Sequence, residues 1–158
     1  MGTRSLTYVI DAEDRYLICC LYRHYDGSLE GHGQDLMAFL EGMRVVNGLP
    51  WPGDGERLAN GPEELAALLV WHFKGGHFQG AQAQPERGNI YLHPPAWPRD
   101  DWQEYEYFVL APRTGAPSLF YRKLEYTEGG TEWGPLQRLM GPLPTDLVEG
   151  VLSREAAG

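Results

Sequence analysis

Residues 3–25, TRSLTYVIDAEDRYLICCLYRHY, decide the fold of this chain. From Thr3 to Ile10 the side chains alternate between a more apolar and a more polar side, which is the period of a half-buried β-strand. The run Tyr16–Tyr25 is a second extended segment, and the charged residues between the two runs are polar enough to turn. The pattern therefore predicts a β-hairpin.

The register of this hairpin brings two arginines together. A two-residue loop at residues 13–14 would stack the apolar side chains of both strands on one face, so it is favoured over a one-residue slip. Continued outward, the same register sets Arg4 opposite Arg23, and like charges so placed destabilise a strand pair unless a negative group lies between them. Three nearby carboxylates offer that group: Asp26, Glu30 and Asp35. A bound anion is the alternative.

The segment Tyr22–Asp35, YRHYDGSLEGHGQD, contains the largest concentration of polar groups and glycines. Gly27, Gly31 and Gly33 would let backbone N–H groups approach a ligand, and a helix is expected to begin directly afterwards. The segment has neither the GK[ST] of a P-loop nor the spacing GxGxxG. It therefore permits a phosphate site without identifying one. The alternative is that the glycines simply form tight turns.

The rest of the chain completes an α+β pattern. The expected elements are helices over 34–46 and 62–73, a short strand over 88–93, hairpin strands over 104–110 and 119–126, and a short helix over 144–152. Residues 49–61 are expected to form a surface loop, and no firm structure is predicted for 77–89. We predict one α+β domain over residues 1–158. Its mainly antiparallel sheet has about five strands, with two main helices packed on one face and a short C-terminal helix.

Charged and aromatic side chains accompany the second hairpin. A register that pairs Val109 with Phe120 would put Glu106 opposite Lys123 as an exposed ion pair. Glu104 and Glu106 share a strand face with the spacing of an acid–base pair, but surface ion pairing with neighbouring cations is the favoured interpretation. Four tryptophans fall in or beside Gly/Pro-rich loops: Trp51, Trp97, Trp102 and Trp133. They either cap the core or form a contact surface.

Composition narrows the class of protein. A chain of 158 residues buries a real core without disulfides, and its net charge of −9 argues against a nucleic-acid partner. We expect no secretory signal, because no apolar segment follows a basic start, and the longest apolar run, Leu65–Trp71, is too short to cross a bilayer. We expect a cytoplasmic protein without a membrane partner. Cys19 and Cys20 would point to opposite faces of a strand and are expected to be reduced core residues.

Histidines are the remaining candidates for chemistry. The five are His24, His32, His72, His77 and His93. None shows the HExxH spacing, no Cys–His set has zinc-finger spacing, and no GxSxG elbow offers a serine nucleophile, so no metal and no cofactor is expected. His24 and His32 lie close in sequence to Asp26 and Asp35, which would orient an imidazole base.

Three motifs in the first third of the chain resemble a known family. The opening MGTRSL (1–6), YRHYDG (22–27) and GHG (31–33) are similar to a family of small uncharacterised proteins from bacteria and their phages. Those proteins begin MGTRS and carry YRQYDG…GHG before a helix. The resemblance covers about forty residues, and 88–92 and 104–107 match more loosely. His24 stands where Gln is expected, and residues 28–29 stand where Tyr-Pro is usual. The resemblance brings no activity with it. It implies that one site contains Arg4, Arg23, Tyr25, Asp26 and His32.

Three functions are compatible with these patterns. The first is a binding module for a small phosphate- or nucleotide-like anion, held by two arginines, backbone donors, a stacking tyrosine and His32 as a pH-dependent donor. Its expected ligand-binding residues are Arg4, Tyr22, Arg23, His24, Tyr25, Asp26, Gly31, His32 and Gly33. The second is a protein-interaction domain such as a phage-type inhibitor or an immunity protein. The third is a hydrolase that uses His32 or His24 as base with Asp26.

Overall fold

The computed structural model describes residues 2–48, 57–75 and 89–157, and within them the main sheet has seven strands. Their bounds are Ser5–Asp11 (β1), Tyr16–Arg23 (β2), Ile90–His93 (β5), Tyr105–Ala111 (β6), Ser118–Thr127 (β7), Gly130–Trp133 (β8) and Gln137–Met140 (β9). The strand order is β5-β2-β1-β6-β7-β8, and β9 also pairs with β7. The central pair β1–β6 is parallel, and the other pairs of this sheet are antiparallel. The predicted α+β domain is confirmed, with seven strands in place of about five.

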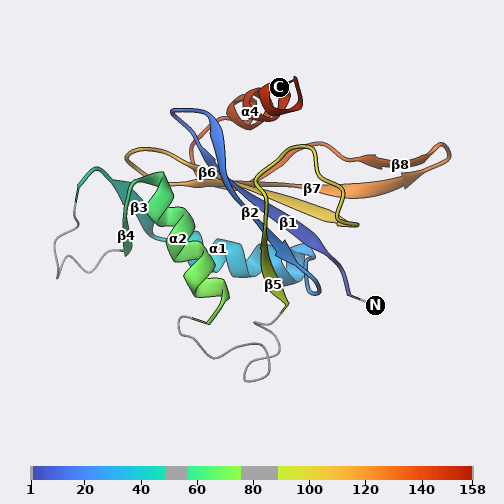
Figure 1. Ribbon diagram of the computed structural model, residues 1–158, viewed down its shortest axis with the longest axis horizontal. Helices are drawn as coiled ribbons and strands as arrows, with labels where there is room; N and C mark the ends of the chain where they lie inside the picture. The colour runs from blue at the N-terminus through green and yellow to red at the C-terminus, as the bar shows by residue number, and fades with distance from the viewer. Residues whose placement is uncertain (1, 49–56, 76–88, 158) are drawn as a thin grey trace.

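Helices cover both faces of this sheet (Figure 1). The helices Gln34–Leu40 (α1) and Gly61–Phe73 (α2) pack on one face, where Val9 and Leu21 join their core cluster. The C-terminal helix, Thr145–Ala157 (α4), packs on the other face through Val148, Val151 and Leu152. No helix in the described residues is long and apolar enough to cross a membrane.

The predicted helix over 34–46 is shorter in the structure. It ends at Leu40, and Gly42 follows with a φ of +73°, a left-handed conformation that glycine adopts without strain. The chain then forms a strand, Met43–Val46 (β3), that pairs in parallel with Arg57–Asn60 (β4). The β-branched pair at 45–46 favours the extended form. β4 lies in the segment expected to be a loop, whereas Trp51 and His77 lie outside the described residues.

The first hairpin forms, but its predicted outer register is wrong. Ile10 pairs with Leu17 as expected, and a β-bulge then shifts the remaining pairs by one residue. Arg23 therefore lies opposite Ser5 and not opposite Arg4. A single extra residue in one strand is enough for this change, because side chains alternate between faces along a strand.

The second hairpin also forms one residue away from its predicted register. Val109 pairs with Leu119, so Glu106 faces Arg122 in place of Lys123. Glu106 is only 1% exposed, so the ion pair that forms with Arg122 has a buried carboxylate, where a surface ion pair was predicted. The segment 94–103 covers Glu106, and Trp97 of this segment packs against the core on the α4 side of the sheet.

Candidate functional site

The residues predicted as one site are divided between the two faces of the sheet. Directly paired residues of neighbouring strands point to the same side, so Arg23 and Ser5 point toward the α1 and α2 layer while Tyr22 and Leu6 point the other way. Alternation also puts the Cβ of Arg4 on the Tyr22 side. The first group is Arg23, Gly31, His32 and Gly33, the second is Arg4, Tyr22 and His24, and Tyr25 and Asp26 lie in the turn after β2.

Arg23 is held by the protein's own acceptors. Its Nε donates to the carbonyl of Tyr25 at 2.9 Å, and its NH1 lies 3.0 Å from both His32 Nδ1 and Asp35 Oδ2. Arg23 is 9% exposed. The sequence left two partners open for this arginine, an internal carboxylate or a bound anion. The structure pairs it with the carboxylate of Asp35. The structure does not bring Arg4 to it.

His32 is a neutral, fully buried residue of this network. A guanidinium only donates, so Nδ1 of His32 accepts from Arg23 and Nε2 carries the proton toward Thr7 Oγ1, 2.7 Å away. The ring packs between Phe73 and Tyr107. Burial, with the charge of Arg23 as a second cause, lowers the pKa of His32 well below its usual value. A substrate has no access to this ring, which argues against the hydrolase hypothesis for His32.

The glycine-rich loop uses its backbone donors internally. The N–H groups of Gly31 and Gly33 donate to the carbonyl of Ser28, and the N–H group of His32 donates to that of Asp26. Residues Leu29–Gly33 form a π-helical turn that leads directly into α1. A Cβ on Gly31 would lie 2.4 Å from the Asp26 carbonyl oxygen, so this glycine is required for close packing. The tight-turn interpretation fits these contacts better than an anion cradle does.

Aromatic and histidine rings line the opposite face near the β2–β5 edge. Tyr22 stacks on His93 with ring centroids 4.7 Å apart, and its hydroxyl is hydrogen-bonded to His24 Nδ1 at 2.8 Å. Nδ1 of His93 lies 3.1 Å from Asp101 Oδ2. This row of rings connects the sheet to the segment 94–103.

Hydrogen bonds fix the segment 94–103 over the sheet. Arg99 donates twice to Asp101, from Nε at 3.0 Å and from NH2 at 3.4 Å. Burial alone would raise the pKa of Asp101, but hydrogen bonds from Arg99 and His93 outweigh it and lower that pKa. Gln103 accepts from the Asp101 N–H and donates to the Arg99 carbonyl, each at 2.8 Å. The segment is therefore rigidly shaped by its own side chains.

Below this segment, an arginine lies between two tryptophan rings. Arg122 donates to Glu106 Oε1 from Nε and NH2, at 2.6 Å in each case. Its guanidinium carbon is 4.7 Å from the ring centroids of both Trp97 and Trp133. Gln103 Nε2 donates to the other oxygen of Glu106 at 3.1 Å. Burial raises the pKa of Glu106, and the charge of Arg122 opposes that shift without cancelling it.

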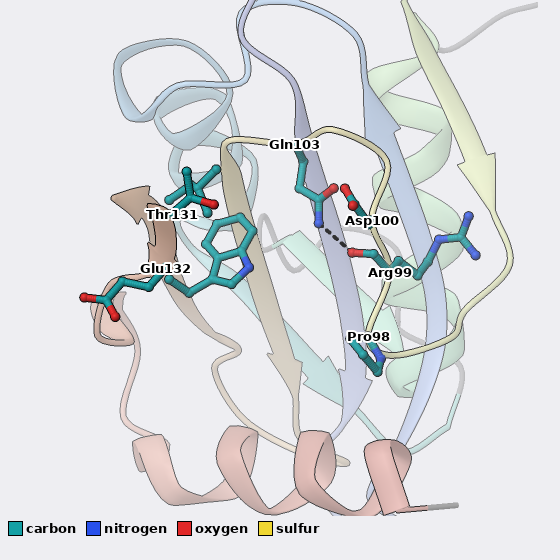
Figure 2. Close-up of a pocket in the computed structure, with 8 residues that line it drawn as sticks. Pro98, Arg99, Asp100, Gln103, Thr131 and Glu132 are labelled. Carbon is teal, nitrogen blue, oxygen red and sulfur yellow. Dashed lines mark hydrogen bonds between the residues drawn. The ribbon is translucent and has the colours of Figure 1, made fainter. Parts of the chain in front are cut away.

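A cavity of about 390 Å³ is lined by two residues that contact this ion pair, Gln103 and Trp133 (Figure 2). We call it the loop–arm cavity, because it lies between the loop 98–103 and an arm, residues 124–133, formed by β8 and the outer part of β7. Its walls include Asp100, Gln103, Leu124, Thr131, Glu132 and Trp133. Figure 2 shows the guanidinium of Arg99 turned away from the arm. Within the described part of the chain, the carboxylates of Asp100 and Glu132 form no ion pair, and Figure 2 shows that of Glu132 pointing away from the loop.

Sequence reasoning named several of these residues without recognising their site. The sequence pattern puts Glu106 in a surface ion pair with a neighbouring cation, and it predicts Trp97 and Trp133 as caps of the core or as a contact surface. Arg99, Asp100 and Gln103 were missed, because a loop of this composition carries no periodic signal. The sequence signal that could have found the site is a strand with charged residues in a chain that has four tryptophans in or beside loops. In the described residues, no three His, Cys, Asp or Glu side chains cluster as metal ligands.

Comparisons with protein-family models, with curated proteins and with solved structures find no match to this chain. We therefore infer the function from the geometry of the chain itself.

Proposed function

We propose that this protein is a binding module whose ligand occupies the loop–arm cavity. The observation that carries the proposal is the cavity itself, whose volume of about 390 Å³ lies within the range of ligand pockets, roughly 300–1,000 Å³. Two of its lining residues are preorganised, because Trp133 packs on Arg122 and Gln103 is hydrogen-bonded to Glu106. A preorganised lining lowers the entropy that binding must remove.

The charges around the cavity favour a neutral or cationic ligand. Asp100 contributes a carboxylate without an ion-pair partner in the described residues, while Arg99 and Arg122 are each paired with a carboxylate of the protein. An anion would meet net repulsion there. The hypothesis of a phosphate- or nucleotide-like ligand at Arg23 has less support, since Asp35, His32 and the Tyr25 carbonyl engage that guanidinium.

A thermal-shift screen tests the proposal with three classes of small probe: arginine amide and spermidine, inorganic phosphate and ATP, and neutral indole. We expect the cationic probes to raise the melting temperature, because a ligand at 100 times its dissociation constant adds about 2.7 kcal/mol to stability. A shift with phosphate or ATP alone would favour the original anion hypothesis.

A blocking variant locates the effect. Thr131→Arg puts a bulky cation on the cavity wall, and we expect it to abolish the shift with arginine amide. Glu128→Gln makes the same change in net charge at the turn of the arm, where it lines no part of the cavity, and should leave the shift intact. Equal shifts in wild type and Thr131→Arg, or no shift with any class of probe, would contradict the proposal.

A further inference from the structure

A second cavity, of about 250 Å³, lies in the layer of α1 and α2, away from the loop–arm cavity. We call it the Arg57 cavity. It is bounded by the end of α1, the C-terminal half of α2 and the strands β3 and β4, and most of its lining residues are apolar or aromatic, among them Phe39, Met43, Leu68 and Trp71. Trp71 is 60% exposed, although tryptophan is usually well covered in folded proteins. An apolar pocket into which a charged group converges is typical of a small-molecule site.

Arg57 is anchored in this cavity without being neutralised. Its NH1 donates to the carbonyls of Ala38 and Glu41, at 3.2 Å in each case, and its guanidinium carbon lies 5.2 Å from the ring centroid of Phe39. Both carbonyls belong to the end of α1, where helical carbonyls lack intrahelical donors. Among the residues that the structure describes, no acceptor contacts Nε or NH2 of Arg57 and no carboxylate forms an ion pair with it. The cavity therefore contains a positioned cation with free donors.

The free donors of Arg57 match a carboxylate. Nε and NH2 lie on one edge of the planar guanidinium, and their N–H bonds point the same way, so they can donate in parallel to two carboxylate oxygens. None of the described residues that line the cavity is acidic, and Glu41, whose carbonyl accepts from Arg57, is not part of the lining. An anionic group therefore meets only attraction from the lining, whereas an ammonium group meets the charge of Arg57.

The size and the walls of the Arg57 cavity restrict the rest of the ligand. Liquid water occupies about 30 Å³ per molecule, so a volume of about 250 Å³ holds roughly eight waters or a group of one or two rings. The lining includes the aromatic rings of Phe39, Trp71 and His72, against which a flat apolar body packs better than a hydrated ion does. We infer that the Arg57 cavity is a second binding site, which takes a small aromatic carboxylate. Nε and NH2 of Arg57 donate to the carboxylate, and the ring packs against Leu68 and Trp71.

Three ligands that share a ring and differ in charge test the inference on the wild-type full chain: phenylacetate, 2-phenylethanol and 2-phenylethylamine. Each is titrated by NMR and read at the indole N–H of Trp71. We expect phenylacetate to shift this signal and to bind about tenfold more tightly than the alcohol, because it gains a bidentate charged hydrogen bond. Equal affinity for the acid and the alcohol, tighter binding of the amine, or no effect of phenylacetate on Trp71 would overturn the inference.

Variants locate the two parts of the ligand. We expect Arg57→Gln to reduce the affinity for phenylacetate about tenfold, to that for 2-phenylethanol, and Trp71→Ala to weaken both ligands. Arg44→Gln makes the same change in charge on β3, where it lines no part of the cavity, and should change neither affinity. If Arg57→Gln binds phenylacetate as tightly as the wild type does, the inference fails. If Arg57→Gln does not fold, the three ligands on the wild type still decide. None of these residues lines the loop–arm cavity, so the result is independent of the proposed function.

Discussion

Arg23 and Arg122 each pair with a carboxylate, on opposite faces of the same sheet, and the two pairs are built in opposite ways. In the Arg23–Asp35 pair the arginine side chain is 10% exposed and the carboxylate is 53% exposed. In the Arg122–Glu106 pair the arginine is 20% exposed and the carboxylate only 1%. The first arginine completes a closed network around His32, whereas the second packs on Trp133, a residue that lines an open cavity.

The difference teaches how to separate a structural charge from a candidate binding charge. Arg23 directs two of its nitrogens at internal acceptors and is only 9% exposed. Arg122 is also satisfied, but it lies over two indoles, one of which lines a cavity that also contains the unpaired carboxylate of Asp100. A buried arginine alone therefore indicates little about function. The unsatisfied groups around it carry the information.

The largest effect on stability is expected from Arg122→Ala. It leaves Glu106 buried without a cation and removes both indole contacts, so we expect a loss of about 3–5 kcal/mol at neutral pH. Urea unfolding measures it. Arg122→Lys keeps a charge and should recover part of the loss. If Arg122→Ala lost less than about 1 kcal/mol, the Arg122–Glu106 pair would be an ordinary surface ion pair, and the contrast between the two arginines would fail.

Arg23→Ala is expected to cost less, about 2 kcal/mol. The variant leaves His32 Nδ1 and the Tyr25 carbonyl without their donor, but the half-exposed Asp35 carboxylate returns to water. The same urea measurement reports the loss. The double variant Arg23→Ala/Asp35→Ala should lose little more stability than Arg23→Ala alone. If Arg23→Ala lost more stability than Arg122→Ala, the order proposed for the two faces would be reversed.

The closed network also predicts a dependence on pH. Because burial lowers the pKa of His32 well below 6.5, the unfolded chain takes up a proton there that the folded chain excludes. The stabilising contribution is fully present above pH about 6.5 and is lost as the pH falls toward the folded pKa, by about 1.4 kcal/mol per pH unit. His32→Gln should lack this slope relative to wild type in urea titrations.

Glu106 contributes to the pH dependence with the opposite sign. Burial raises its pKa above 4.5, so its contribution is present below that pH and is lost as the pH rises through the folded value. Glu106→Gln carries an uncharged amide, so we expect that its stability does not fall in this way as the pH rises.

NMR titration of the His32 ring in the folded chain is an independent check of the closed network around His32. A ring that protonates near pH 6.5 while the chain stays folded would contradict the closed network.

The smallest effect is expected from Asp35→Asn. Its carboxylate is 53% exposed, and ion pairs with that exposure contribute less than about 1 kcal/mol. Thermal unfolding at low and high salt measures it, and the difference between the two proteins should shrink as salt screens the pair. A loss comparable to that of Arg23→Ala would mean that Asp35, and not the contact with His32, holds the arginine.

The sequence predicted those features that arise from local periodicity. Alternation between Thr3 and Ile10 and helical spacing after Pro62 correspond to β1 and α2 in the structure. The extended form of β3 was missed, because Met43–Val46 continues the helical spacing and only its pairing with β4 decides against a helix. Tertiary pairing overrides local propensity in such a short segment.

The predicted site failed for a related reason. One bulged residue in the first hairpin puts Arg23 on the opposite face of the sheet from Arg4. The amino-acid composition of a strand does not predict a bulge. Glu106 was placed one residue out of register, so its burial was not foreseen. The loop–arm cavity combines the loop 98–103 with the arm 124–133, and only the folded chain brings these segments together.

The parallel pairing of β1 with β6 has a consequence for synthesis of the chain. Asp11 ends β1 and Tyr105 begins β6, so 94 positions separate the two strands that form the centre of the sheet. At translation rates of about 5–20 residues per second, one edge of the first hairpin waits roughly 5 to 20 s for its partner. A nascent chain halted in that interval exposes an unpaired β-edge, which is the kind of surface that chaperones shield and that aggregates recruit.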